Sequence, residues 1–391
     1  MQANVENNKE MTEIFTDLLS SLQTALWRTI EEGNIVISDD VHSEAKAQAV
    51  EGLLSTLIVN DNRWRQINYS YIARFLRMED FQRQTIELLQ SNAIPVVVLK
   101  GMAAGVYYPN TMLRAYGDID LLVHPKRYQD AIALLSANEF RVDSEVGHYH
   151  TAFRKPGYDF EIELHQCPPG LDEVKEGQFI HSFMLSGLED IQTGIIIETG
   201  SAFPMLPWKQ NGLELIWHIR EHLYNGLGLR QIIDWMMFIY HNLNDQAFQE
   251  YEDILKQSGL LTLAKTVTRM CQMYLGLTES ITWCADVDDK LCEELMGYIL
   301  DQGNFGHKRQ DDKAAKVLTR YKTPIAFLKG MQRKGLYEWE AAKHHKWLRP
   351  LAWMYVGWNG CRQYFTRDGR KALLKNQRES KRRDALFKKL Y

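Results

Sequence analysis

The spacing of apolar residues divides the chain into a helical beginning, a mixed centre and a long helical remainder. Between residues 10 and 91, apolar side chains recur three and four positions apart, which predicts amphipathic helices. The run Ile94–Leu99 is apolar throughout and short, as is typical of a buried strand. From about Pro207 onward the helical spacing returns, with helices expected at Leu213–His222, Gln231–Asn242 and Phe248–Gly259.

The centre of the chain alternates between strands and helices. A short helical stretch after Leu99 ends at Tyr108-Pro109, and a second strand, Ile119–Val123, stops at His124-Pro125 before a helix near Tyr128. Three more strands are expected at Phe140–Asp143, His148–Arg154 and Tyr158–His165.

This order predicts an α+β fold, in which a small mixed sheet is flanked by helices. A helical segment precedes this core, and a large helical domain follows it. The expected divisions are an N-terminal helical segment at 1–90, the α/β core at 91–206, the helical domain at 207–361 and a basic helical tail at 362–391.

Composition is that of a globular protein, with 391 residues, 45% of them hydrophobic, and a formal net charge of −4. The chain as a whole therefore has no electrostatic bias toward nucleic acid, but residues 362–391 hold eleven Lys or Arg against three Asp or Glu. This tail could contact RNA, an acidic partner or a membrane surface. Because it lacks interleaved aromatic residues, a solvated helix face is the favoured interpretation. Trp347, Trp353 and Trp358, just before it, are expected to pack.

The expected compartment is the cytoplasm. The first ten residues are polar and acidic, unlike a secretory signal, and the longest apolar stretches are far shorter than the roughly 18 residues of a membrane span. The five cysteines are odd in number and show no Cys-x-x-Cys spacing, which favours neither disulfides nor a zinc knuckle.

Two carboxylates stand at the start of the second strand, Asp118 and Asp120. Alternate residues of a strand face the same side, so these carboxylates lie about 7 Å apart along the backbone and repel one another unless a cation is bound. A hard divalent ion such as Mg²⁺ fits oxygen ligands of this kind. On its own, however, an Asp-x-Asp pair at the mouth of a strand is commonly only solvated.

A third acidic position strengthens the metal interpretation. Glu161, Glu163 and His165 share one face of the expected strand Tyr158–His165. If this strand pairs beside the one that follows Asp118, three carboxylates converge and suit two metal ions roughly 3.5–4 Å apart. The third carboxylate could be Glu163 or Glu161.

Phosphate-binding groups are expected at the end of the first strand. Lys100-Gly101 ends that strand and opens a helix, where backbone N–H groups and a glycine allow close approach of a phosphate. Lys100 offers a point charge and Arg114 a planar fork. A glycine at such a turn is ordinarily no more than a turn, so the combination carries the inference.

The ordered set of motifs resembles the uncharacterised nucleotidyltransferase family of the polymerase-β-like superfamily, over approximately residues 90–310. The resemblance rests on Leu99-Lys100-Gly101, Tyr108-Pro109, Leu113-Arg114, Gly117-Asp118-Ile119-Asp120-Leu121-Leu122-Val123 and Glu163-Leu164-His165. Trp217-His218, Asp234-Trp235 and Gly303-Asn304-Phe305-Gly306 also look like that family's helical half.

The resemblance implies transfer of a nucleoside monophosphate from an NTP to a hydroxyl, with release of pyrophosphate and with two Mg²⁺ ions. Asp118 and Asp120 would bind both ions, and Glu163 would serve the ion that activates the acceptor. Lys100, Gly101, Arg114 and Gly117 would bind the nucleotide, with secondary contacts from His222, Arg230 and Asp234. Where superfamily members have Gly-Gly or Gly-Ser at the phosphate turn, this chain has a single glycine followed by Met102.

Histidines offer further candidates. His218 and His222 lie four residues apart on one helix, which is metal-ligand spacing, although core or surface histidines are commoner. His148 and His150 could approach the metals or merely belong to a half-exposed strand.

The leading hypothesis is a Mg²⁺-dependent nucleotidyltransferase acting on a small molecule, protein or RNA hydroxyl. Two alternatives remain open: a non-catalytic nucleotide-binding or interaction protein with the same fold, and an RNA-modifying enzyme guided by the basic tail.

Overall fold

The computed structural model describes most of the chain and divides it into two compact units. One unit comprises Met1–Phe305 with Tyr391, and the other comprises Gly306–Leu390, and each is treated by itself. The described residues are 2–27, 35–58, 60–146, 149–167, 175–304, 331–332, 335–336, 339, 341–342, 345–364 and 382–391.

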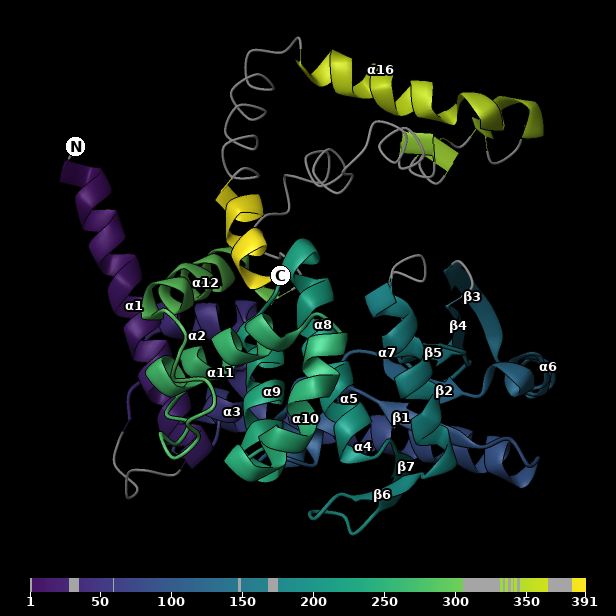
Figure 1. Ribbon diagram of the computed structural model, residues 1–391, viewed down its shortest axis with the longest axis horizontal. Coiled ribbons are helices and arrows are strands. Elements are labelled where there is room, and N and C mark those ends of the chain that lie inside the picture. The colour runs from purple at the N-terminus through teal and green to yellow at the C-terminus, as the bar shows by residue number, and fades with distance from the viewer. Residues whose placement is uncertain are drawn as a thin grey trace. The chain divides into compact units, whose positions relative to one another are not determined.

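A seven-stranded mixed sheet lies at one side of the first unit (Figure 1), and this mixed α+β architecture confirms the predicted fold class. Its order is β3-β4-β5-β2-β1-β7-β6, with β2 parallel to β5, β1 parallel to β7 and the other neighbours antiparallel. The strands are β1 (Val96–Leu99), β2 (Ile119–Val123), β3 (Arg141–Val146), β4 (His150–Arg154), β5 (Glu161–His165), β6 (Gln192–Ile195) and β7 (Ala202–Met205).

The first five strands were expected from the sequence, and β2 has the expected bounds. The sequence analysis did not predict β6 and β7. In β6 only Gly194 is buried, so this edge strand shows no alternation of apolar and polar residues from which it could be recognised.

One face of the sheet carries the apolar core of the α/β region. Ile119 and Leu121 of β2 and Ile162 and Leu164 of β5 point into a buried cluster that includes Phe81 of a long helix. Because successive strand residues alternate faces, Asp120 and Glu163 lie on the opposite face. The helices and 3-10 turns up to this sheet are α1 (Gln2–Trp27), α2 (Asp39–Ala47), α3 (Glu51–Leu54), α4 (Asn62–Ser91), α5 (Gly101–Gly105), η1 (Thr111–Leu113), η2 (Pro125–Arg127), α6 (Tyr128–Ala137), α7 (Lys175–Ser186) and η3 (Gly187–Glu189).

Helices from both ends of this unit pack together beside the sheet (Figure 1). The indole N–H of Trp27 in α1 donates to the carbonyl of Leu275, with 2.6 Å between nitrogen and oxygen, and the Gln23 amide donates to Tyr274. The predicted N-terminal segment and the predicted helical domain therefore share a packed interface. The later helices are α8 (Trp208–Asn225), α9 (Leu229–Asn242), α10 (Asp245–Gln257), α11 (Leu261–Leu275) and α12 (Asp289–Gln302).

The described part of the second unit contains η5 (Lys346–Leu351), α16 (Ala352–Tyr364) and a helix at 382–390. Trp347 and Trp358 are 73% and 72% exposed, so the expectation that they pack is wrong, and Trp353 is 40% exposed. Residues 365–381 of the predicted basic tail lie outside the described residues. None of the described helices is long and apolar enough to cross a membrane.

Candidate active site

The second and fifth strands bring the predicted carboxylates to one face of the sheet. β2 and β5 pair in parallel, with Asp120 directly beside Glu163 in the register. Asp118 immediately precedes β2, two residues before Asp120. The expected pairing of the two acidic strands is therefore present, and it places Asp120 and Glu163 on the same face of neighbouring strands.

The loop that leads into β2 is held by the long helix α4. The guanidinium of Arg74 donates to the carbonyls of Tyr116 and Gly117, at 3.1 and 3.3 Å, and packs over the ring of Phe160 at 4.8 Å. A side chain at Gly117 would meet no atom within 4 Å, so this glycine faces open space directly before Asp118. The backbone beside the first carboxylate is thus fixed on one side and open on the other.

Asp120 is buried and lies between two cationic groups. Its Oδ1 is 3.3 Å from Lys100 Nζ and 2.9 Å from His165 Nε2. Burial alone would raise the pKa of Asp120, but the charges of Lys100 and His165 outweigh it and hold that pKa well below its usual value. Burial likewise opposes a charge on His165, yet its hydrogen bonds to Asp120 and Glu163 raise its pKa to about 9.

Asp118 has the opposite electrostatic environment. Loss of surrounding water, followed by repulsion from Asp120 and Glu163, raises the pKa of Asp118 to about 6. The residue as a whole is exposed. A carboxylate with a raised pKa beside two other carboxylates is a group whose charged form a cation would stabilise.

Glu163 has histidine neighbours as well as acidic ones. Its carboxylate lies 3.4 Å from His165 Nε2 and 3.7 Å from His150 Nε2. Within the described chain, these three residues form the group of His, Cys, Asp or Glu side chains that is close enough for one ion, with ligand atoms within 4.8 Å of one another. Of the predicted triad Asp118, Asp120 and Glu163, only Glu163 belongs to this group.

Glu161, the alternative third carboxylate, is directed elsewhere. Arg154 of β4 lies 2.5 Å from its Oε2 and 3.4 Å from Asp143 of β3. Glu163, and not Glu161, is the residue in register with Asp120.

The turn after β1 places Lys100 inside the protein. Lys100 has a φ of 48°, which is rare for a residue with a side chain, and its ammonium lies between Asp120 and the buried Glu214 of α8, 3.7 Å away. Gly101 follows with a φ of 31°, and no atom lies within 4 Å of the position that a side chain would occupy. The structure thus places the lysine charge at the carboxylates and leaves the glycine backbone accessible.

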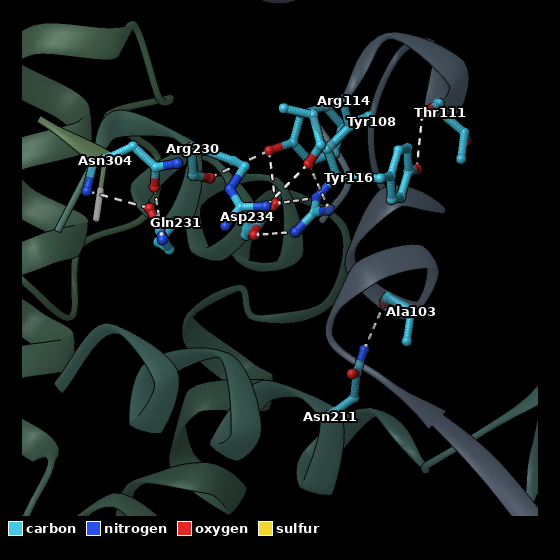
Figure 2. A network of polar contacts seen from close by, with 12 residues as sticks. Ala103, Tyr108, Thr111, Arg114, Tyr116, Asn211, Arg230, Gln231, Asp234 and Asn304 are labelled. Atoms are coloured by element: carbon cyan, nitrogen blue, oxygen red, sulfur yellow. Dashed lines mark hydrogen bonds and ion pairs between the residues drawn. The ribbon is translucent and has the colours of Figure 1, made fainter. Parts of the chain in front are cut away.

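Arg114 and Asp234 form a buried ion pair, together with Tyr108 (Figure 2). Two guanidinium nitrogens of Arg114 lie 2.7 Å from the two carboxylate oxygens of Asp234, and the hydroxyl of Tyr108 donates to the same carboxylate at 2.7 Å. Both charged side chains are 2% exposed. These contacts join the loop before β2 to helix α9, and they occupy the fork of Arg114 that was predicted to bind phosphate.

Two other predicted nucleotide contacts come from the helical half. Arg230 of α9 donates to the carbonyl of Ala115 at 3.1 Å, close to the Arg114 and Asp234 pair (Figure 2). His222 of α8 lies against His218, with 4.3 Å between the ring centroids. Burial, followed by the charge of Arg230, lowers the pKa of His222 to about 4, so this imidazole is neutral near pH 7.

Glu214 of α8 was not singled out from the sequence. It is 1% exposed, and burial raises its pKa. Among the residues that the structure describes, neither of its carboxylate oxygens has a hydrogen-bond partner. Glu214, His218 and His222 recur every four residues, a spacing that places all three on one side of the helix. The four-residue spacing of the two histidines was visible in the sequence, but nothing in the sequence indicated that Glu214, four residues before them, would lie at the site.

A cavity of about 630 Å³ lies away from the carboxylates. It is bordered by the β6–β7 hairpin, the start of α8 and the residues after α5. Its lining includes Tyr107, Trp208 and Lys209, and no predicted site residue.

The profile of the uncharacterised nucleotidyltransferase family matches residues 41–276. The chain belongs to this family. The match contains the five segments that carry the site geometry: the turn after β1, the start of β2, β5, helix α8 and helix α9. It confirms the resemblance read from the motifs, and it begins earlier than expected, at residue 41. It ends at residue 276, so the motif Gly303-Asn304-Phe305-Gly306 lies outside the match. Family membership supports an enzyme of the nucleotidyltransferase type.

Two solved structures are similar to this nucleotidyltransferase family member at low identity. The antibiotic-resistance factor ANT(2'')-Ia is 12% identical, with a TM-score of 0.32, and the match covers 48% of this chain and 92% of that chain. An antigenic nucleotidyltransferase-like protein from Paracoccidioides brasiliensis is 17% identical, with a TM-score of 0.29, covering 47% of this chain and 88% of that one. No curated protein matches the chain.

Proposed function

We propose that this protein is a Mg²⁺-dependent nucleotidyltransferase, which transfers a nucleoside monophosphate from an NTP to an acceptor hydroxyl and releases pyrophosphate. The single observation that carries the proposal is the parallel pairing that sets Asp120 beside Glu163, with Asp118 two residues away. The acceptor class, a small molecule, protein or RNA, stays open.

The residues present suit divalent ions. Asp118 is a carboxylate whose pKa is raised by loss of water and by its acidic neighbours, and Asp120 has its charge balanced by Lys100 and His165. Such a site gains from a bound cation, and Asp118, Asp120 and Glu163 would hold it. Ions at this position would lower the pKa of the acceptor hydroxyl and neutralise charge on the phosphates.

The chain's own residues supply the remaining roles. The open backbone at Gly101 and at Gly117 leaves room for phosphate oxygens. Lys100 would hold Asp120 in its ionised form through its charge. Arg114 and Asp234 would act by fixing the loop before Asp118 and not by touching the nucleotide, which alters the roles predicted for them. Arg230 and His222 remain proposed contacts from the helical half.

The test is an acceptor screen with each of the four NTPs and Mg²⁺, in which mass spectrometry detects an acceptor that gains one nucleoside monophosphate. The variant carrying both Asp118→Asn and Asp120→Asn should give no such product and retain its fold by circular dichroism. Glu161→Gln is the control, because it removes a carboxylate from the neighbouring strand β5, at the position paired with Arg154 and not beside Asp120. Product formation by the double variant at the wild-type rate would rule out the assigned roles.

Calorimetry separates this proposal from the non-catalytic alternative. Binding of Mg²⁺ with an NTP, without product over the whole acceptor screen, would favour a nucleotide-binding protein. Turnover that depends on Asp118 and Asp120 would exclude that alternative.

A further inference from the structure

The pairing of β4 with β5 places two histidines on either side of Glu163. His150 is the antiparallel partner of His165, so both imidazoles lie on the sheet face that carries Glu163. Their ring centroids are 4.8 Å apart. Two imidazoles and one carboxylate thus meet at a place where the proposed function requires only oxygen ligands.

The contacts of both rings run toward the carboxylates through the same nitrogen. His150 Nε2 faces Glu163, and His165 Nε2 faces Glu163 and Asp120. Nδ1 of each ring is buried without a hydrogen-bond partner in the described structure. Nε2 is therefore the nitrogen of each ring that is in position to bind an ion together with Glu163.

The spacing of the ligand atoms matches a single ion. Metal bonds of about 2.0–2.2 Å in a tetrahedral site put neighbouring ligand atoms roughly 3.4 Å apart. His165 Nε2 lies 3.4 Å from Oε2 of Glu163, and His150 Nε2 lies 3.7 Å from Oε1 of the same carboxylate. One ligand atom from each of the three residues lies within 4.8 Å of the others, so small side-chain shifts would bring them to the spacing that one ion needs. Asp120 Oδ1, 2.9 Å from His165 Nε2, stands next to the group as a further oxygen donor.

We propose that His150, Glu163 and His165 form a metal subsite that binds a divalent first-row transition ion, of the Zn²⁺ or Co²⁺ class, in preference to Mg²⁺. Imidazole nitrogens suit transition ions, whereas Mg²⁺ favours oxygen ligands and retains its water. This inference rests on the proposed function only in giving Glu163 a metal-binding role. It adds that the two ions of the site differ in kind, with an oxygen-only position at Asp118 and Asp120.

The probe is Co²⁺ alone, added to the metal-free full-length chain and followed by its visible d–d absorption. Four-coordinate Co²⁺ with nitrogen ligands absorbs visible light strongly, whereas Co²⁺ in an octahedral oxygen site absorbs it weakly. We expect a strong spectrum with one equivalent of Co²⁺, not reversed by a large excess of Mg²⁺. His150→Gln should weaken Co²⁺ binding at least about tenfold, because even outer partners of metal ligands cost that much when removed.

Controls separate loss of a ligand from loss of the fold. His165 is fully buried, so Co²⁺ binding by His165→Gln is interpreted together with the circular dichroism of that variant. His150 is partly exposed, so His150→Gln keeps the test informative if His165→Gln unfolds. His124→Asn removes an imidazole outside the group and retains an oxygen that can cap η2, so it should leave Co²⁺ binding unchanged.

Three results would overturn the subsite: a weak octahedral spectrum, displacement of Co²⁺ by equimolar Mg²⁺, or equal Co²⁺ affinity in wild type and His150→Gln. Each can occur while nucleotide transfer proceeds with Mg²⁺, in which case the proposed function stands without the subsite. A spectrum of nitrogen-ligated Co²⁺ without any nucleotide transfer would support the metal subsite and contradict the proposed function.

Discussion

The buried pair between Arg114 and Asp234 gives the sharpest prediction for stability. In Asp234→Asn the guanidinium stays in place, 2% exposed, but loses the carboxylate that compensates its charge. Removing one partner of a buried ion pair costs about 3–5 kcal/mol, because the remaining charge is neither hydrated nor neutralised. The hydroxyl of Tyr108, which donates to the same carboxylate, can still donate to the amide oxygen of asparagine, so it adds little.

That loss converts into a melting shift. At about 2.1 cal/mol/K per residue, a unit of this size unfolds with an entropy of roughly 0.6 kcal/mol/K. A loss of 3–5 kcal/mol should therefore lower the melting temperature by about 5–8 °C. Differential scanning calorimetry at neutral pH measures this shift, provided that the unit melts as one transition.

Two control variants test the reasoning. Glu87→Gln breaks an exposed pair with Arg83 and should shift the free energy of unfolding by about 0.5 kcal/mol or less. Combining Arg114→Met with Asp234→Leu and Tyr108→Phe removes both charges and the hydroxyl at once. It should recover part of the stability, because no Arg114 charge is left buried without a counter-charge, while the nearby Arg230 still loses the charge of Asp234. If Asp234→Asn had the same melting temperature as Glu87→Gln, the ion pair between Arg114 and Asp234 would not be the buried electrostatic link described above.

Three further predictions concern the site itself. The carboxyl of Asp118 carries its proton below about pH 6 and must lose it to bind a cation. Mg²⁺ affinity measured by calorimetry should therefore fall roughly tenfold per pH unit below 6 and level off above 7. A flat pH profile of the affinity would contradict this assignment. Lys100→Met should tighten Mg²⁺ binding about tenfold. One positive charge at about 5 Å repels a divalent ion by roughly 1–2 kcal/mol even at the dielectric constant of water, and the variant removes that repulsion. Unchanged or weaker Mg²⁺ binding would show that the ion lies elsewhere. Gly101→Ala should lower the free energy of unfolding in urea by about 1 kcal/mol, because alanine disfavours the positive φ of this residue, although a methyl group has room there. A loss of several kcal/mol would show that this turn has no room for a methyl group.

The sequence predicted the elements that are locally encoded. β2 was recognisable as a short, mainly apolar run that is buried throughout, and β5 because Glu161 and Glu163 alternate with the buried Ile162 and Leu164. Their parallel pairing was only a condition in the sequence argument, since no local pattern specifies which strands become neighbours. The register that sets Asp120 beside Glu163 came from the fold.

Partners distant in sequence were beyond local patterns. Arg114 looked like a phosphate ligand because a lone arginine near a carboxylate motif offers no sign of Asp234, 120 residues later. Glu214 and His150 were missed or set aside for the same reason, because they reach the site from α8 and β4. β6 lacked any pattern at all, having one buried position, a glycine.

The most direct test of the central claim is a crystal structure with Mn²⁺ in place of Mg²⁺ and a non-hydrolysable NTP analogue, with the metal located by anomalous scattering. The account predicts metal bound to oxygens of Asp118 and Asp120, with the triphosphate reaching the open backbone at Gly101. Triphosphate and metal bound in the cavity beside Trp208 and Lys209, with the carboxylates of β2 and β5 free of both, would contradict it.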